Sequence, residues 1–488
     1  MSNLFLYKNK LLRDGRIISI LSFSLFYGWL WCLAFEGKVF YAMAQKQCSH
    51  SEIHIMMQMA LIFQFFGLFL SGFFIKNAKQ AKKIMLIAIF FCIYGSLVFF
   101  LPFSVFWYIS IGLISMLAGI VVGGWGFWIQ SEVPQKKRVY IAADILILSN
   151  VFEISTNVIT VNVSQQLGLL LCIILLIASM IFTAHLPKNN LERDTPKKIK
   201  SKSIGTEIPI KLLIILYLFM TIITINWGLM YTIICSDFAH IERFTSWYWC
   251  TPYLIAVYIM RRFASKTNRY SILFVVIAMS GFSFIFYGIL DNSLTSYVII
   301  NTLMLGSYGL CDLFSWSILG EILDYTKNPA KIFGIGLSAN VLGTVLGRMI
   351  ANRIIGISSN DFITTIIAIS VGFIVIIILP ILYKQLSVVL DYHDDPLNLE
   401  KNTERHLVKL HEEFLLSKEI TEREKEIIEK ILQGKTYKMI SEELFLSINT
   451  VKFHIKNIYS KLNVHNRQEL IGIIEKNGKK EKNYYNSK

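Results

Sequence analysis

The sequence predicts an all-α protein built from two parts, a bundle of twelve apolar helices and a small C-terminal domain of four helices. Up to residue 383 the chain carries twelve long apolar runs separated by short polar or basic loops. Beyond residue 417 the apolar residues recur instead at the three- and four-residue spacing of amphipathic helices. The first part is therefore expected to lie in a lipid bilayer and the second in water.

The composition fits a membrane protein and gives no sign of catalysis. Hydrophobic residues make up 54% of the 488 residues and charged residues only 17%, with a mean hydropathy of +0.53, whereas soluble chains carry about 25% charged residues. The seven cysteines form neither a CxxC pair nor a cluster with histidine, so no zinc site and no disulfide framework is predicted. The sequence also contains no P-loop and no nucleophile–base set. We expect no enzymatic activity, no metal and no cofactor.

Twelve membrane spans are predicted from runs that approach the roughly 20 apolar residues needed to cross a bilayer core. The eighth run is short and the eleventh carries Arg348 and Arg353, so these two are the weakest. The spans are expected near residues 17–35, 53–75, 84–101, 104–129, 139–161, 167–185, 210–235, 246–260, 271–290, 295–318, 332–355 and 362–383.

The loops between the spans alternate in charge. The net charge is +15, and the loops on one side hold little of it besides Lys38, Lys46 and Arg243. The basic residues gather in the other loops, at 76–83, 136–138, 187–209, 261–269 and 327–331. Because positively charged loops stay in the cytoplasm, both termini are predicted to be cytoplasmic and the protein to lie in the cytoplasmic membrane. An even number of spans predicts the same arrangement.

The long basic loop at 187–209 divides the spans into six and six. It contains three prolines and little apolar periodicity, so it is interpreted as a linker. Six plus six spans around a central cytoplasmic loop resemble the major facilitator superfamily over residues 1–385. That resemblance implies two six-helix halves around a midplane cavity. The family's loop between spans two and three usually reads GxxxD followed by basic residues. Here the stretch GFFIKNAKQAKK begins at Gly72 and places Lys76 where the Asp would stand.

Three polar residues lie deep within predicted spans: Glu153, Asp312 and Arg348. Such residues are costly in a membrane and often mark ligand sites or proton pathways. The alternative is a structural ion pair between one of the carboxylates and Arg348, and the sequence leaves both interpretations open. The glycines of VVGGWGFW (123–126) and GIGLSANVLGTVLG (334–347) are predicted to let helices approach closely.

A cytoplasmic linker is predicted at residues 386–417, where hydropathy falls and the acidic stretch DYHDDP occurs. If flexible, such a segment spans roughly 30–35 Å on average. The domain that follows is predicted at 418–476, with a basic disordered tail at 477–488.

The C-terminal domain shows the start and stop signals of three helices. Thr421 and Glu424 fit a capping box, in which each side chain bonds the other residue's amide. Gly434 stands where a helix-ending glycine belongs, and Ser447 is predicted to be the N-cap of the third helix. In that third helix one apolar stripe is predicted to be buried, formed by Val451, Ile455, Ile458 and Leu462.

The stretch TEREKEIIEKILQGKTYKMISEELFLSINTVKFHIKNIYSKLNVHNRQEL strongly resembles the LuxR-type helix-turn-helix over about 50 residues. The resemblance implies that the exposed face of the third helix enters the major groove of double-stranded DNA, and that a fourth helix near residues 467–474 pairs two domains as a homodimer. Phe453 departs from the small or polar residue common in the family, and Tyr437 departs from the usual Asn. The predicted DNA-binding residues are Lys438, Ser447, Asn449, Thr450, Lys452, Phe453, Lys456, Asn457, Lys461 and Arg467.

These features predict a membrane-embedded one-component transcription regulator. Its bundle would sense a small molecule or a membrane signal, and its terminal domain would bind DNA. The alternative is a major-facilitator-type transporter that carries a regulatory DNA-binding domain. Neither the ligand nor the target operator is encoded in a motif.

Overall fold

The computed structural model describes residues 15–35, 37–186, 210–263, 269–357, 361–394, 420–432, 435–444, 446–467 and 469–470. Within these residues the chain is helical and has no strand. The chain divides into two compact units, Met1–Gln385 and Leu386–Lys488. The predicted central loop 187–209, helix-ending Gly434 and basic tail lie outside the described residues.

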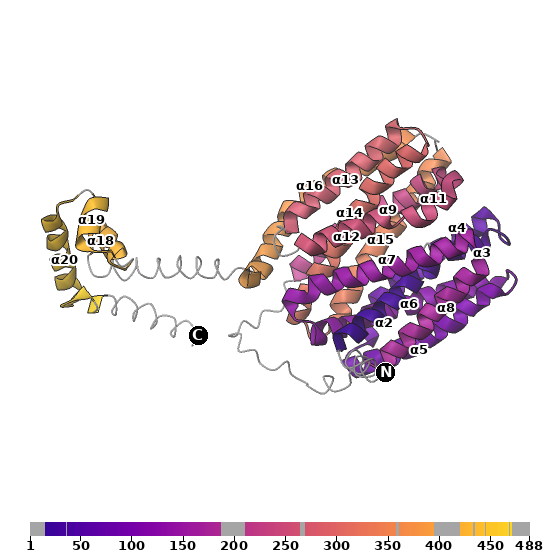
Figure 1. Cartoon of the computed structure of the whole chain (residues 1–488), viewed down its shortest axis with the longest axis horizontal. Helices are drawn as coiled ribbons and strands as arrows, with labels where there is room; N and C mark the ends of the chain where they lie inside the picture. The colour runs from indigo at the N-terminus through magenta and orange to yellow at the C-terminus, as the bar shows by residue number, and fades with distance from the viewer. Residues whose placement is uncertain are drawn as a thin grey trace, which may run out of the picture. The chain divides into compact units, whose positions relative to one another are not determined.

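The first half of the membrane unit contains the first six spans (Figure 1). Its first span is interrupted by a π-helical turn, and a Cβ at Gly37, just after that turn, would lie 1.7 Å from the Cys32 carbonyl oxygen. Only glycine therefore fits where the chain turns into the next helix. The elements are α2 (Gly15–Trp29), η1 (Leu30–Ala34), α3 (Lys38–Ala44), α4 (His50–Phe74), α5 (Ala78–Leu97), η2 (Val98–Phe100), α6 (Val105–Glu132), η3 (Gln135–Lys137), α7 (Arg138–Asn162) and α8 (Gln165–Ala184).

The second half contains the remaining spans and ends in the longest helix. That helix, α16, continues through residues 386–394, which were predicted as linker, so the chain leaves the bundle as a helix. The elements are α9 (Ile210–Thr232), α10 (Ile234–Asp237), η4 (Ala239–Ile241), α11 (Glu242–Tyr248), α12 (Thr251–Phe263), α13 (Arg269–Ile289), α14 (Leu294–Ile322), η5 (Leu323–Tyr325), α15 (Pro329–Ile357) and α16 (Asp361–Asp394).

Eleven helical segments among the described residues are long and apolar enough to cross a membrane. The expected eighth span, residues 246–260, is not one of them. The prediction of twelve continuous spans is therefore corrected at this position. The run is split into α11 and α12 by a turn at residues 249–250, next to Pro252, which has no backbone amide to donate. At ~1.5 Å per residue, α12 alone is shorter than a bilayer core. Both pieces pack against α7.

The two halves meet along two seams. In one seam α15 packs against α4 and α6, and in the other α7 packs against α11, α12 and α14. At the α4–α15 crossing a Cβ on Gly334 would lie 2.5 Å from the Leu68 carbonyl oxygen. Within the second half, a Cβ on Gly347 would lie 2.0 Å from the Ile225 carbonyl oxygen of α9. The prediction that these glycines serve close helix packing is confirmed.

The C-terminal unit contains three described helices around one apolar core. They are α18 (Glu422–Leu432), α19 (Tyr437–Glu443) and α20 (Ile448–Leu462). The core combines isoleucines from all three helices with Val451, Leu462, Val464 and Leu470. The fourth helix predicted near 467–474 lies mostly outside the described residues.

Candidate nucleic-acid interface and membrane cavity

Helix α20 has one buried and one exposed face. Its buried face is the predicted stripe of Val451, Ile455, Ile458 and Leu462. The other face presents Asn449, Lys452, Phe453 and Lys456 as exposed residues, with Thr450 and Asn457 half-buried. Phe453 is 62% exposed, which leaves a large apolar ring in water. Among the described residues, neither Lys452 nor Lys456 forms an ion pair, so both ammonium groups are available to an anionic partner.

Caps fix where the helices of this domain begin. Ser447 is the N-cap of α20, and its hydroxyl accepts a hydrogen bond from the Thr450 amide at 3.0 Å. Thr421 and Glu424 form the predicted capping box, with distances of 2.9 Å and 3.3 Å. Glu424 is also bound by Lys461 at 2.7 Å, which ties the start of α18 to the end of α20. Burial raises the pKa of Glu424, but the Lys461 ammonium and the Thr421 hydrogen bonds outweigh it, so the pKa lies below its ordinary value.

Two of the predicted DNA-binding residues have partners inside the domain. Lys461 binds Glu424, and the Arg467 guanidinium donates to the carbonyl oxygens of Ile431 (2.9 Å) and Lys435 (3.0 Å). Arg467 therefore satisfies one carbonyl group in the last turn of α18 and one just after the helix ends. Lys438 lies in α19, and its side chain is outside the described set. Their contact with DNA stays a prediction.

The unusual Tyr437 is accommodated by packing. Its ring packs against the apolar core, and its hydroxyl lies 3.4 Å from that of Tyr459. Burial and this hydrogen bond raise the pKa of Tyr459 to about 12. Tyr459 is therefore neutral at physiological pH, and the two tyrosines join α19 to α20.

The membrane unit contains a cavity of about 750 Å³ between its halves. Glu153, Asp312 and Arg348, which the sequence singled out, all line it. The described hydrogen bonds of the two carboxylates come from neutral groups. Asp312 accepts one from the Tyr253 hydroxyl at 2.9 Å, and Glu153 accepts one from the Asn157 amide at 3.4 Å.

The cavity reaches one end of the bundle, where α3 and α11 lie (Figure 1). Its lining residues there include Gln45, His50 and Glu242. Toward the other end of the bundle, a cluster of buried aromatic side chains closes the cavity. In that cluster Trp125 stacks on Phe23 with ring centroids 4.2 Å apart, and Phe333 packs on Trp316 at 5.3 Å.

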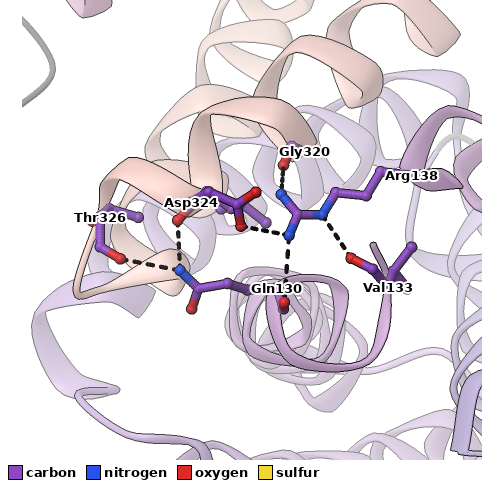
Figure 2. Close-up of polar contacts among 7 residues, drawn as sticks. Gln130, Val133, Arg138, Gly320, Asp324 and Thr326 are labelled. Atoms are coloured by element: carbon purple, nitrogen blue, oxygen red, sulfur yellow. Dashed lines mark hydrogen bonds and ion pairs between the residues drawn. The ribbon is translucent and has the colours of Figure 1, made fainter. Parts of the chain in front are cut away.

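A polar network closes the same end, where α6, α7 and α14 meet (Figure 2). The buried Arg138 guanidinium donates to the carbonyl oxygens of Gly320 (2.6 Å) and Val133 (3.1 Å), and it pairs with Asp324 at 2.6 Å. Gln130 donates to the Thr326 carbonyl oxygen at 3.1 Å. This network links the two halves of the bundle.

This network could not be predicted from the sequence. Arg138 lies among the basic loop residues that predict orientation, and nothing in the local sequence shows that its side chain turns inward. A second pair, also not predicted, joins the halves from α7 to α12. There Asp144 binds Arg261 through both carboxylate oxygens, at 2.6 Å and 3.1 Å.

The model of the bacterial regulatory proteins of the luxR family matches residues 418–474. GerE, a spore germination protein of Bacillus subtilis (strain 168), is 42% identical over 59 residues, which are 12% of this chain and 80% of GerE. The chain belongs to the luxR family. Another luxR-type relative, the transcriptional regulatory protein LiaR of the same organism, is 52% identical over 58 residues, which cover 12% of this chain but only 28% of LiaR. These luxR-family matches are confined to the DNA-binding domain.

The membrane unit is similar to solved transporter structures. A bacterial homologue of the iron transporter ferroportin, in its outward-facing state, superposes with a TM-score of 0.58 at 13% identity and covers 76% of this chain and 99% of its own. The major facilitator superfamily transporter FucP, in the outward conformation, gives 0.55 at 11% identity, with coverages of 76% and 99%. At such low identity the likeness shows the fold alone. This luxR-family protein is therefore a multi-pass membrane protein with a major-facilitator-like fold and a luxR-type DNA-binding domain.

Proposed function

We propose that this protein is a membrane-embedded one-component transcription regulator. The bundle senses a small molecule in the cavity, and the luxR-type domain binds double-stranded DNA as a homodimer. The observation that carries the proposal is the presence, in one chain, of a closed-ended cavity and of a capped helix whose free face holds Lys452, Phe453 and Lys456. The basic loops of the sequence support a cytoplasmic position for both termini, in the cytoplasmic membrane.

DNA contact is assigned to particular residues of α20. Lys452 and Lys456 are proposed to bind phosphate or base edges, Thr450 and Asn457 to donate hydrogen bonds, and the exposed Phe453 ring to contact a thymine methyl group. Ser447 holds the start of the helix and Asn449 lies beside it, so both are proposed to act near the phosphate backbone.

Gel-shift titration tests the DNA-binding half of the proposal. The fragment 418–488 is suitable because it contains the whole matched region, 418–474, and because the match to GerE covers 80% of the length of GerE. We expect salt-sensitive binding to DNA upstream of neighbouring genes. Lys452→Ala or Lys456→Ala should weaken it about tenfold, and the salt slope should fall by about one unit for each lysine that neutralises a phosphate.

Lys425→Ala is the matched control, because Lys425 lies on α18 and pairs with Glu422 at 2.6 Å. It should leave the affinity unchanged. Absence of salt-sensitive binding by a folded fragment would reject the DNA-binding proposal.

A transporter is the second candidate, favoured by the cavity that opens to one end and is closed at the other. It predicts accumulation or efflux of a solute by vesicles that contain the full chain, with loss of transport in Glu153→Gln or Arg348→Gln. The regulator predicts ligand-dependent transcription without net flux.

A further inference from the structure

Asp312 is a buried carboxylate without a cationic partner among the described residues. It lies in the middle of α14, is 8% exposed and lines the cavity. Among the described residues, its hydrogen bond comes from the Tyr253 hydroxyl, at 2.9 Å. A buried carboxylate is strongly destabilising unless a cation or several hydrogen bonds compensate it. The site therefore favours a positively charged occupant.

The side chains around Asp312 are aromatic. On α14 itself, Tyr308 and Trp316 lie one helical turn before and after it, and both line the cavity. Tyr27 packs on Trp316 with ring centroids 5.5 Å apart and on Trp31 at 4.7 Å. Trp31 in turn meets the Tyr253 ring edge-on at 5.8 Å.

This arrangement combines the two features that recognise organic cations. Aromatic faces carry partial negative charge and attract ammonium groups within about 6 Å, and most strongly where water is excluded. A carboxylate at the centre of such a group of rings adds the opposite charge. Phosphate or carboxylate ligands would be repelled at this position.

The cationic groups of the cavity lie elsewhere. Lys38 bonds the Thr245 hydroxyl at 2.8 Å and lies within electrostatic range of Glu153, so that carboxylate already has a positive neighbour. Arg348 lies one turn from Asn352, which contacts His54 at 2.9 Å near the start of α4. In the inner part of the cavity, the described cationic groups therefore leave Asp312 without a counter-charge.

We propose that the inner part of the cavity binds an organic cation, an ammonium or quaternary ammonium group carried on an apolar body. Asp312 supplies the charge, and Tyr27, Trp31, Tyr253 and Trp316 supply the aromatic wall. A cavity of about 750 Å³ is large enough for a complete small molecule of this kind. The inference deepens the proposed function, because the sensing role of this cavity rests on that proposal.

Equilibrium binding to the purified full chain in lipid nanodiscs tests the inference. The probe is radiolabelled phenylbutyl-trimethylammonium, whose charge does not depend on pH, and the competitor is its neutral isostere, in which carbon replaces nitrogen. We expect saturable binding of the cation, and competition by the isostere that is weaker by about tenfold or more. Asp312→Asn should abolish binding, Asp312→Glu should retain part of it, and Trp316→Leu should weaken it.

Asp312→Asn is expected to fold, because it removes a desolvated charge and keeps the side-chain shape. The elution profile in size-exclusion chromatography and the helical signal in circular dichroism test whether this variant is folded. Asp291→Asn, the same change outside the cavity, is the matched control and should bind like the unmodified protein. Equal competition by the neutral isostere, or undiminished binding by a folded Asp312→Asn variant, overturns the inference. Binding that depends on Asp312 but leaves a transcription reporter unchanged supports the inference and counts against the sensing role.

Discussion

The DNA-binding domain and the membrane domain are held together by different forces. In the DNA-binding domain, isoleucines from three short helices share one core, as water requires of a small amphipathic fold. In the membrane domain, many large apolar side chains face outward, Phe90 and Phe106 among them. Lipid offers no hydrophobic drive between helices, so close glycine contacts and buried polar links hold the bundle.

The two domains also differ in how closely they match their relatives. The DNA-binding domain is 52% identical to its counterpart in LiaR, whereas the membrane domain is 13% identical to a ferroportin homologue of similar fold. DNA presents the same phosphates and base edges to every such domain, which limits the residues that can stand on the DNA-contacting helix. A cavity is restricted only by its own ligand, so fold similarity leaves its chemistry open.

The largest effect is expected where backbones of the membrane domain touch. In Gly347→Ala the new Cβ would lie 2.0 Å from the Ile225 carbonyl oxygen, a backbone atom that cannot move without displacing α9. We expect a loss of about 3 kcal/mol or more of stability, measured as unfolding of the purified protein in detergent. Gly281→Ala is the control and should be tolerated, because no atom of the described residues lies within 4 Å of the new Cβ. Equal stability of both variants would contradict the packing argument.

A smaller effect is expected at the two polar links between the halves. Arg138→Gln removes a buried guanidinium with several partners and should lower the free energy of unfolding by about 2 kcal/mol, because Asp324 keeps partial access to water. Arg261→Gln breaks the Asp144 pair, in which both side chains are about one-third exposed, and should cost less than about 1 kcal/mol. The two variants are compared by the midpoints of their unfolding transitions, measured on the purified proteins in detergent. A larger loss for Arg261→Gln would show that burial does not set the strength of these links.

In the DNA-binding domain, removal of the Glu424 charge should have a smaller effect than removal of Arg138 has in the membrane domain. Glu424→Gln removes the charged partner of Lys461 and weakens the capping box, so thermal unfolding of the fragment 418–488 should show a loss of about 1–2 kcal/mol at neutral pH. Glu422→Gln is the control, because that side chain is 86% exposed, and no measurable change is expected.

The contribution of the Glu424 carboxylate to the stability of the fragment 418–488 should also depend on pH. Its pKa is lower in the folded domain than the ordinary value of 4.5, so the stabilisation is complete above pH 4.5. It is lost as the pH falls below 4.5 and through the folded-state pKa, because the unfolded chain takes up the proton first. Between neutral pH and the acid range, the free energy of unfolding should fall less steeply in the Glu424→Gln fragment than in the unmodified fragment. Identical pH profiles would assign the acid sensitivity to other carboxylates.

Prediction from sequence succeeded where the signal was local. The buried stripe of α20 and its Ser447 cap follow from spacing and residue type within one helix. Most spans can be predicted from hydropathy alone, because whether a helix can cross a bilayer depends on its own length and apolar composition. The eighth span was the exception, since a turn beside Pro252 divides a run that hydropathy treats as continuous.

The partners of charged residues could not be predicted in this way. The sequence offered Arg348 as an ion-pair partner for Glu153 or Asp312, but Asp312 meets Tyr253, which is 59 residues away in the chain. Arg138 reaches Asp324 across 186 residues. Such pairings depend on how the two six-span halves meet.

The sequence by itself determined that the chain joins an apolar helical bundle to a small domain of capped amphipathic helices, because periodicity, caps and hydropathy act within single elements. The luxR type of that domain followed from the resemblance of its motif. Only the tertiary structure decided that Glu153, Asp312 and Arg348 line one cavity, that this cavity is closed at one end by Arg138 and an aromatic cluster, and that Asp312 lies among aromatic rings. These features are set by contacts between helices distant in sequence, and no local pattern encodes which faces of those helices meet.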